Sequence, residues 1–238
     1  MSTALHYATP QRRRERPLSA VEPWPVAPEP ASRRLLNVLI ALLGIVLTAP
    51  LLLVIALLVG ATSPGPVVFV QHRVGIDRRH GSRPGSDAEE DAGGRPFEMY
   101  KFRTMYVRPD GVDPQVWATP GDSRVTPVGR LLRGTRLDEL PQLFNVLKGD
   151  MNVVGPRPEQ PAIFKRLRRE ITSYQVRQRA RPGITGLAQV TLTYDRDIED
   201  VRRKVALDLD YLRRQSVGED LRIMAKTLPV MLGRRAGW

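Results

Sequence analysis

The sequence predicts an α+β fold in which a small, mostly helical domain with a short β-hairpin rests on an N-terminal re-entrant membrane helix and on amphipathic surface helices. Three observations lead to this prediction. A long uncharged apolar run, 35–61, lies near the N-terminus. Two strand-like segments, 65–75 and 96–105, flank a polar stretch, and several apolar patterns with helical period follow them.

Composition limits the chemistry and the partners that are open to the chain. The 238 residues include 37 Lys and Arg against 25 Asp and Glu, a formal charge of +12, which favours a polyanionic partner such as a membrane surface, nucleic acid or a phosphorylated substrate. The chain has no cysteine, which excludes disulfides, thiolate catalysis and cysteine metal sites. Its three histidines, His6, His72 and His80, lack metal-ligand spacing, which argues against a zinc site.

The N-terminal third of the chain divides into a tail and a membrane segment. Residues 1–31 are rich in proline and arginine and are expected to form a disordered tail. The apolar run after them is long enough to span a membrane, but Pro50, which follows Ala49, predicts a break in the helix. Arginines flank the run on both sides, and the positive-inside rule then favours both ends in the cytoplasm. A re-entrant helix over 32–62 satisfies both flanks, although these residues alone support a straight span about equally.

Two strands are expected to form a hairpin. The polar stretch between them, 77–95, is rich in Gly and Ser and predicts a flexible, solvated loop insertion. In the second strand, period-two alternation places Lys101 and Arg103 on one face. Two cations on one face suit phosphate binding, although a solvated strand face explains them as well.

The stretch 136–150 carries the most concentrated chemistry. It contains a short helix with one apolar face, made by Leu140, Leu143, Phe144 and Leu147. Proline is tolerated only in the first turn of a helix, so Pro141 predicts a start near Glu139 with Asp138 as the N-cap. Gly149 predicts the end of this helix.

Charged side chains crowd around the start of this helix. Asp138 and Glu139 are expected at the positive end of the helix dipole, where phosphates also bind. Arg136 precedes them, and a short strand followed by a stiff Gly-Pro-Arg-Pro-Glu turn supplies Arg157 and Glu159. A structural N-cap is the simplest interpretation of Asp138, but this combination of acids and cations favours metal-assisted phosphoryl chemistry.

The remaining segments predict mostly helices. Helices are expected over 126–133, 161–180, 198–214 and 220–232, with a turn and a strand over 181–190. The helix over 161–180 is strongly basic, so it either faces solvent or contacts lipid head groups. Asp195-Arg196-Asp197 has the form of an Asp-x-Asp metal motif, although so short a pattern often occurs by chance.

Four motifs in this order resemble those of the bacterial sugar transferase family, which is the monotopic phosphoglycosyl transferase superfamily, in its small single-domain form. The motifs are Lys101-Phe102-Arg103-Thr104-Met105, Leu137-Asp138-Glu139-Leu140-Pro141-Gln142-Leu143, Val154-Gly155-Pro156-Arg157-Pro158-Glu159 and Arg181-Pro182-Gly183-Ile184-Thr185-Gly186. The resemblance extends from about residue 35 to about residue 232, apart from the loop insertion.

The resemblance implies an enzyme that moves a sugar-1-phosphate from a UDP-sugar to polyprenyl (undecaprenyl) phosphate and releases UMP. This step initiates the assembly of lipid-linked exopolysaccharide, O-antigen or other glycoconjugates. The resemblance also implies a cytoplasm-facing catalytic domain over 63–238 at the bacterial inner membrane. The implied cofactor is Mg²⁺, and the implied partners include inner-membrane lipid but not nucleic acid. The resemblance leaves open whether the protein forms a homodimer.

The motif match also implies roles for individual residues. Asp138 would be the nucleophile that forms a covalent phosphosugar intermediate, and Asp138 and Glu139 would hold the metal, or Glu139 would act as a positioning partner. The implied phosphate- and substrate-binding residues are Lys101, Arg103, Arg136, Arg157 and Glu159. The family's re-entrant helix breaks near a Ser-Pro pair, where this chain has Ala49 and Pro50.

One departure from the family concerns the sugar donor. After Gln189-Val190 many members carry Asn-Gly-Arg, whereas this chain has Thr191-Leu192-Thr193-Tyr194. If that region contacts the sugar or the nucleotide, the donor differs from theirs.

Two other functions are compatible with the sequence. A metal-dependent glycosyltransferase that uses Asp195 and Asp197 would release UDP rather than UMP. A basic membrane- or nucleic-acid-binding adaptor without catalysis would account for the charge of +12. It gives no reason, however, for two adjacent carboxylates beside arginines.

Overall fold

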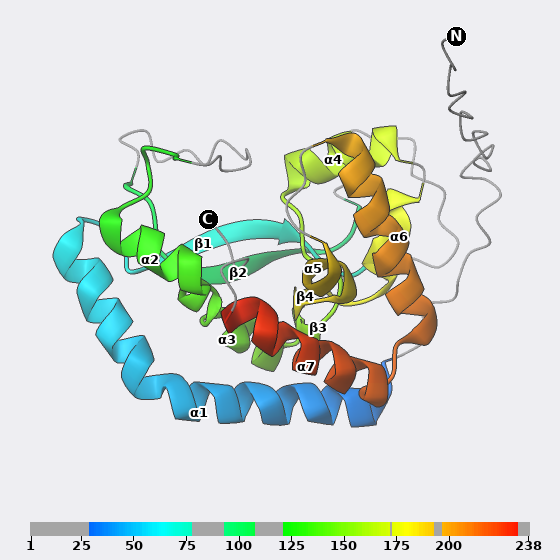
Figure 1. Cartoon of the computed structure of the whole chain (residues 1–238), viewed down its shortest axis with the longest axis horizontal. Coiled ribbons are helices and arrows are strands. Elements are labelled where there is room, and N and C mark those ends of the chain that lie inside the picture. The colour runs from blue at the N-terminus through cyan, green and yellow to red at the C-terminus, as the bar shows by residue number, and fades with distance from the viewer. Residues whose placement is uncertain (1–28, 78–92, 108–120, 172, 193–196, 233–238) are drawn as a thin grey trace, which may run out of the picture.

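The computed structural model describes residues 29–77, 93–107, 121–171, 173–192 and 197–232. In chain order its elements are α1 (Ala31–Thr62), β1 (Val68–Val74), β2 (Pro96–Phe102), α2 (Pro127–Thr135), the 3-10 turn η2 (Leu137–Glu139), α3 (Gln142–Lys148), β3 (Asn152–Val154), α4 (Pro161–Glu170), the 3-10 turn η3 (Tyr174–Arg179), β4 (Gly183–Thr185), α5 (Leu187–Thr191), α6 (Ile198–Arg214) and α7 (Val217–Leu232). This arrangement confirms the α+β class (Figure 1). The predicted tail, except for its last residues, and most of the loop insertion lie outside the described residues.

Helix α1 is one bent helix that runs along the outside of the domain (Figure 1). Pro50 lies in its interior, where it removes a backbone hydrogen bond and clashes with the preceding turn, so the predicted break in the helix is confirmed as a bend. The helix is long and apolar enough to cross a membrane, and only 11% of its apolar 18-residue stretch is buried inside the protein. Its exposed residues include Leu35, Leu39, Leu42, Leu43, Val46, Leu47, Leu53, Val54, Leu57 and Leu58. Such exposure distinguishes α1 from the core helix of a soluble protein and makes it a candidate membrane segment.

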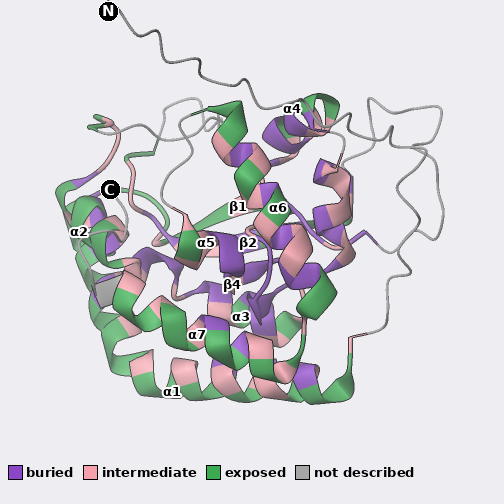
Figure 2. Ribbon diagram, turned by 45° about the vertical axis from the view of Figure 1, so that its right-hand side comes forward, coloured by how far each residue is buried: buried purple, intermediate pink, exposed green. Residues whose placement is uncertain are grey.

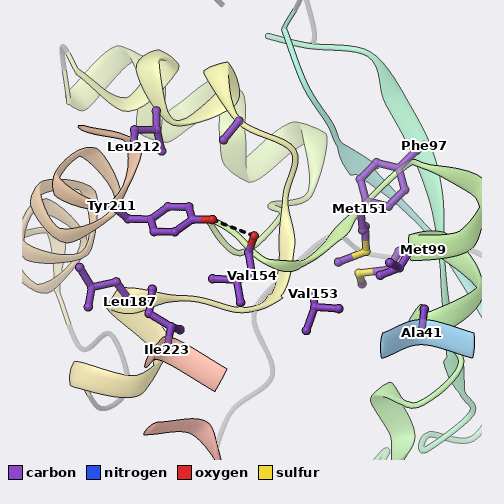
Figure 3. Close-up of a cluster of buried hydrophobic side chains, with 12 residues drawn as sticks. Ala41, Phe97, Met99, Met151, Val153, Val154, Leu187, Tyr211, Leu212 and Ile223 are labelled. Carbon is purple, nitrogen blue, oxygen red and sulfur yellow. Dashed lines mark hydrogen bonds between the residues drawn. The ribbon is translucent and has the colours of Figure 1, made fainter. Parts of the chain in front are cut away.

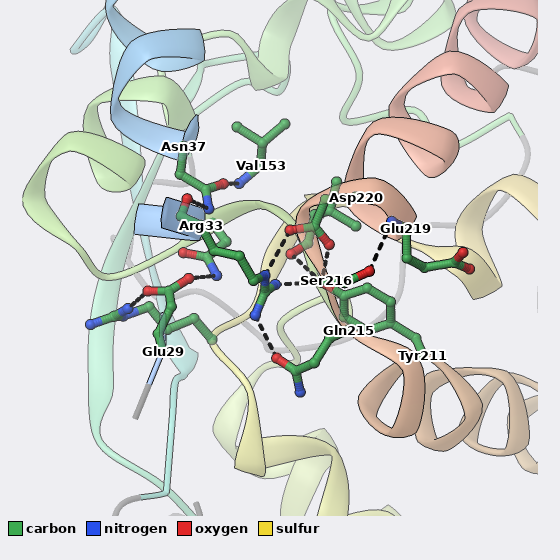
Figure 4. A network of polar contacts seen from close by, with 12 residues as sticks. Glu29, Arg33, Asn37, Val153, Tyr211, Gln215, Ser216, Glu219 and Asp220 are labelled. Carbon is green, nitrogen blue, oxygen red and sulfur yellow. Dashed lines mark hydrogen bonds and ion pairs between the residues drawn. The ribbon is translucent and has the colours of Figure 1, made fainter. Parts of the chain in front are cut away.

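The inner face of the first half of α1 is polar. Arg33 donates three hydrogen bonds, to Asp220 Oδ2 at 2.9 Å, Tyr211 Oη at 2.8 Å and Gln215 Oε1 at 2.5 Å (Figure 4). Asn37 Oδ1 accepts a backbone N–H from β3 at 2.7 Å. A helix with polar residues inside and leucines outside reverses the pattern of a water-facing amphipathic helix. This reversal suits an outer face that meets lipid.

Two small sheets support the rest of the domain. β1 and β2 form the predicted antiparallel hairpin, with Val68 opposite Phe102, and β3 pairs with β4 in parallel, with Val154 opposite Thr185. The main hydrophobic cluster lies between α1, these sheets and the helices α5 to α7, and the Tyr211 hydroxyl within it donates to Val154 O at 3.1 Å (Figure 3). Figure 2 shows the buried residues in the middle of the domain and the exposed outer side of α1.

The prediction of one basic helix over 161–180 is wrong. Helix α4 ends at Glu170, and η3 begins at Tyr174 after Ile171, which is extended and buried. The change of direction turns Arg177 inward, where it pairs with Asp208 of α6 at 2.6 Å instead of facing solvent or lipid. In addition, α4 lies on the side of the domain away from α1 in both overall views (Figures 1 and 2), which gives no support to contact with lipid head groups. The helix predicted over 198–214 is confirmed as α6.

Candidate active site

Asp138 and Glu139 lie in the turn η2 and not at the start of α3. Helix α3 begins at Gln142, after Pro141, so the predicted N-cap role of Asp138 is wrong. The turn follows Arg136, whose φ of 59° lies in the left-handed region and redirects the chain after α2. Within the described part of the chain, the Asp138 carboxylate makes no hydrogen bond or ion pair. Its side chain is therefore not committed to capping a helix.

Glu139 gathers the cations of the site. Its Oε1 accepts a hydrogen bond from Arg157 Nη2 at 2.6 Å, and its Oε2 lies 3.4 Å from Nη1 of the same guanidinium. Lys101 Nζ and Arg136 Nη1 lie 3.5 and 3.8 Å from Oε1. Three predicted phosphate-binding cations, from three separate elements, thus meet at one buried carboxylate.

These cations are not fully enclosed. The side chains of Arg157 and Arg136 are 36% and 32% exposed, whereas that of Glu139 is 9% exposed. Each guanidinium has more N–H groups than its contact with Glu139 uses, and these groups suit the oxygens of a phosphate. The arrangement therefore presents arginine donors to a ligand while Glu139 holds them in place.

The two neighbouring carboxylates differ in their acidity. Burial raises the pKa of Asp138 to about 6, against the opposing charge of Lys101. Burial also acts on Glu139, but the charges of Arg157 and Lys101 outweigh it and hold the pKa of Glu139 below its usual range. Burial lowers the pKa of Lys101 to about 8. Environments that push the pKa values of two adjacent acids apart give them separate roles, here a permanently charged Glu139 and an Asp138 that titrates near neutrality.

Glu159 lies beside this cluster in an ion pair that the sequence analysis missed. Its Oε1 accepts a hydrogen bond at 3.2 Å from Nη1 of Arg73, a residue of β1, and the same nitrogen donates to Pro158 O at 3.0 Å. Glu159 therefore helps to hold its own turn. The sequence placed Arg73 at the end of a strand, but which turn lies beside that strand end depends on tertiary packing.

Arg103 does not join the carboxylates. It is buried, and its guanidinium donates to Pro66 O and Ser63 O, each at 2.5 Å, and to the Ser63 hydroxyl at 2.8 Å. These contacts hold the end of α1, which stops at Thr62. The prediction of a shared phosphate-binding face with Lys101 fails because β2 ends at Phe102, before Arg103.

The carboxylates lie next to the second half of α1. Leu137 and Leu140, on either side of the pair, pack against a cluster that includes Ile55 and Val59 of α1. A further cation that the sequence analysis missed is Arg133, whose charge opposes the effect of burial on the pKa of Asp138. The site is thus built between the basic turns of the domain and the apolar helix.

The surroundings of Glu139 bear on the predicted metal site. The described residues contain no group of three or more His, Asp or Glu side chains that could hold a metal. Because both oxygens of Glu139 face cations, the geometry favours its alternative role as a positioning partner. Asp138 is then a single carboxylate, and Mg²⁺ is commonly held by one or two carboxylates together with substrate phosphates. Asp138 therefore fits Mg²⁺ in the presence of a diphosphate substrate.

Of the two acids in the alternative Asp-x-Asp motif, Asp197 has a structural role. Asp197 caps α6 by accepting the backbone N–H of Asp200 at 2.9 Å. Asp195 lies outside the described residues.

Comparison with known proteins identifies the family of the chain. The family model for bacterial sugar transferases matches residues 29–234, which include α1. The chain is 44% identical over 202 residues to a UDP-glucose:undecaprenyl-phosphate glucose-1-phosphate transferase of Caulobacter vibrioides, with 84% of this chain and 69% of the relative covered. It is 42% identical over 200 residues to a UDP-N-acetylgalactosamine-undecaprenyl-phosphate N-acetylgalactosaminephosphotransferase of Aeromonas hydrophila, of which it spans 43% while 84% of this chain is covered.

A third relative matches along nearly its whole length. This is the exopolysaccharide production protein PSS of Rhizobium leguminosarum bv. phaseoli, 36% identical over 215 residues, with 87% of this chain and 98% of the relative covered. The match to the family model alone extends over most of the chain, from the start of the apolar helix to the end of α7. The chain belongs to the bacterial sugar transferase family.

Proposed function

We propose that this protein transfers a sugar-1-phosphate from a UDP-sugar to undecaprenyl phosphate or a related polyprenyl phosphate and releases UMP. The observation that carries the proposal is Asp138, a buried carboxylate without a side-chain partner in the described part of the chain, beside Glu139 and its three cations. The names of the Caulobacter and Aeromonas relatives support the pairing of a UDP-sugar with undecaprenyl phosphate.

The reaction proceeds in two displacements at one phosphorus atom. In the first, an Asp138 carboxylate oxygen attacks the phosphorus that bears the sugar, and the bond to the oxygen of UMP breaks, so that UMP leaves with the electron pair. This gives an acyl phosphate between Asp138 and the sugar phosphate. In the second, an oxygen of the polyprenyl phosphate attacks the same phosphorus, the bond to Asp138 breaks, and the carboxylate is restored. The product is a polyprenyl diphosphate sugar.

The residues around Asp138 lower the cost of bringing anions together. Arg157, Arg136 and Lys101 offset the charge of the diphosphate, and Glu139 keeps these side chains oriented before the substrate arrives. Asp138 and phosphate oxygens of the substrate would hold Mg²⁺, which when bound supplies further charge neutralisation at the diphosphate. The low exposure of Asp138 limits the access of water, which hydrolyses acyl phosphates.

We also propose that α1 is re-entrant in the bacterial inner membrane and that the catalytic domain faces the cytoplasm. The same domain holds both ends of α1, through Arg33 at its start and Arg103 just after its end. The bend at Pro50 lets both ends lie on one side of the bilayer, and the basic residues on both flanks favour the cytoplasmic side. The lipid substrate then arrives beside the carboxylates, because Leu137 and Leu140 pack on α1.

A nucleotide-product assay tests the proposed reaction. The full chain in detergent or nanodiscs is incubated with polyprenyl phosphate, Mg²⁺ and a panel of UDP-sugars, and the released nucleotide is identified by chromatography. UMP is expected with at least one UDP-sugar. When the UDP-sugar is in large excess over the enzyme, continued release of UMP should require the polyprenyl phosphate. Release of UDP would instead support a glycosyltransferase that uses Asp195 and Asp197. Binding to liposomes with no turnover on any UDP-sugar would support the adaptor.

The pH dependence of the reaction reports the state of Asp138. Because burial raises the pKa of Asp138 to about 6, the reactive carboxylate becomes scarce below that pH. We expect kcat/KM for the UDP-sugar to fall about tenfold for each further pH unit of acidification. Initial rates across the acidic range, at a low fixed Mg²⁺ concentration and limiting UDP-sugar, measure this slope for the metal-free enzyme. A rate that stays constant well below pH 5 would contradict the assignment of Asp138 as the attacking group.

A further inference from the structure

The turn that carries Arg157 is held by four hydrogen bonds to consecutive backbone carbonyls. The donors are Gly183 N to Pro156 O at 3.0 Å, Arg177 Nη2 to Arg157 O at 3.0 Å, Arg73 Nη1 to Pro158 O at 3.0 Å and Val74 N to Glu159 O at 2.9 Å. They come from β4, η3 and β1. Two of them are guanidinium groups, so the carbonyls of the turn are fixed by side chains as well as by backbone N–H groups.

Arg177 is the donor that binds Arg157 itself. Its side chain is 7% exposed, and its Nε donates to Asp208 Oδ2 at 2.6 Å, where the Asp208 side chain is 3% exposed. The guanidinium carbon also lies 4.8 Å from the centre of the Tyr174 ring. The ion pair and the ring fix the guanidinium, which directs another of its N–H groups at the Arg157 carbonyl.

A buried ion pair contributes little net stability, because the cost of desolvating both charges offsets much of their attraction. The location of this pair is informative. Arg177 holds the backbone of the residue whose guanidinium contacts both oxygens of Glu139, next to Asp138. We infer that Arg177 and Asp208 form a positioning pair, which sets the position of Arg157 against Glu139 and the substrate phosphates. The inference rests on the proposed function for the role of Arg157, and neither member of the pair contacts substrate.

A double-mutant cycle on the full-length enzyme tests this inference. Arg177→Lys keeps a positive charge opposite Asp208, but a single ammonium group cannot reach both Asp208 Oδ2 and Arg157 O. We expect kcat/KM for UMP release to fall about tenfold to a hundredfold, which is the usual effect of a displacement of about 1 Å at a reacting centre. In an Arg157→Lys background the same change is expected to alter kcat/KM by less than about twofold, because the position of the guanidinium no longer matters. Asp208→Asn should reproduce this pattern and replaces Arg177→Lys if the lysine variant folds poorly.

The second buried arginine–aspartate pair supplies a matched control. Asp220→Asn weakens the Arg33–Asp220 pair, which is as deeply buried as the Arg177–Asp208 pair but lies at α1. Any effect of Asp220→Asn on kcat/KM is expected to be the same in the wild-type background and in the Arg157→Lys background. If Arg177→Lys also acts equally in both backgrounds, its role is structural and the inference is overturned.

A structural measurement separates this inference from the proposed reaction. If the wild-type protein released no UMP from any UDP-sugar, the proposed function would fail, but the positioning pair could still be tested by crystallography or cryo-electron microscopy of Asp208→Asn. We expect the Arg157 guanidinium to move away from Glu139 in that variant, while η2 keeps its conformation. Retention of the 2.6 Å contact between Arg157 and Glu139 would refute the inference.

Discussion

Asp138→Asn is expected to abolish UMP release and, at the same time, to stabilise the fold. An amide cannot form the acyl phosphate on which the proposed reaction depends, and loss of a nucleophile generally costs at least about a thousandfold in kcat. The stabilisation follows from burial, which raises the pKa of Asp138 from its ordinary 3.8 to about 6. The desolvation that raises the pKa of Asp138 therefore also makes the folded state less stable.

The sign of this effect follows from proton linkage. A raised pKa means that the folded protein binds the proton on Asp138 more tightly than the unfolded chain does, so the fold loses stability as pH rises from about 4 to about 6 and stays weakened above that range. The difference between 3.8 and about 6 corresponds to about 3 kcal/mol at neutral pH, as an upper limit for the gain on neutralising the side chain.

Thermal unfolding at two pH values measures this gain. We expect the Asn variant to have a higher Tm than the wild type at neutral pH. Near pH 3 the two Tm values should be nearly equal, because that pH lies below both the folded and the unfolded pKa of Asp138 and most of the side chain is protonated in both states. Asp150→Asn, a partly exposed acid near the end of α3, is the control and should change neither turnover nor Tm by much. Residual turnover close to that of the wild type would rule out Asp138 as the nucleophile, and a lower Tm at neutral pH would show that its charge is compensated in the fold.

Arg33→Met is expected to destabilise the protein by about 3–5 kcal/mol, because it leaves the buried Asp220 carboxylate without its cation. The Arg33 and Asp220 side chains are 4% and 1% exposed, and their Nε–Oδ2 distance is 2.9 Å. Arg33 also donates to Tyr211 and Gln215, so its removal detaches the first half of α1 from α6 and from the start of α7 (Figure 4).

Unfolding of the purified protein in detergent, followed by circular dichroism in a denaturant series, gives the free-energy change. The double variant Arg33→Met/Asp220→Asn should lose less stability than the sum of the two single variants, since it removes both charges together. Arg203→Met is the control, because its pair with Asp200 is largely exposed and is worth less than about 1 kcal/mol. A loss from Arg33→Met as small as that of the control would mean that the network does not anchor α1.

Local sequence features were sufficient for many of the elements. The hairpin of β1 and β2, the bend at Pro50 and the 17 residues of α6 all follow from period-two alternation, a proline or a helical apolar stripe, which act over a few neighbouring residues. The family also follows from the sequence, because four motifs occur together in order. For the site, Arg136 and Arg157 were predictable near Glu139 because they belong to one helix–strand–turn unit. Lys101, on a distant strand, was assigned to the site only through the family resemblance.

The partners of the charged residues required the tertiary structure. Periodicity shows which face of an element is buried, but not what lies against it, so Arg103 was placed with the phosphate-binding cations although it holds the end of α1. Likewise Arg177 had the sequence context of a solvated helix, yet the break after α4 buries it against Asp208. Asp138 shows the same division. The sequence by itself determined that an acid stands among cations in a member of the bacterial sugar transferase family, whereas only the packing of η2 against α1 and β2 decided that this acid is buried, does not cap a helix and has a raised pKa.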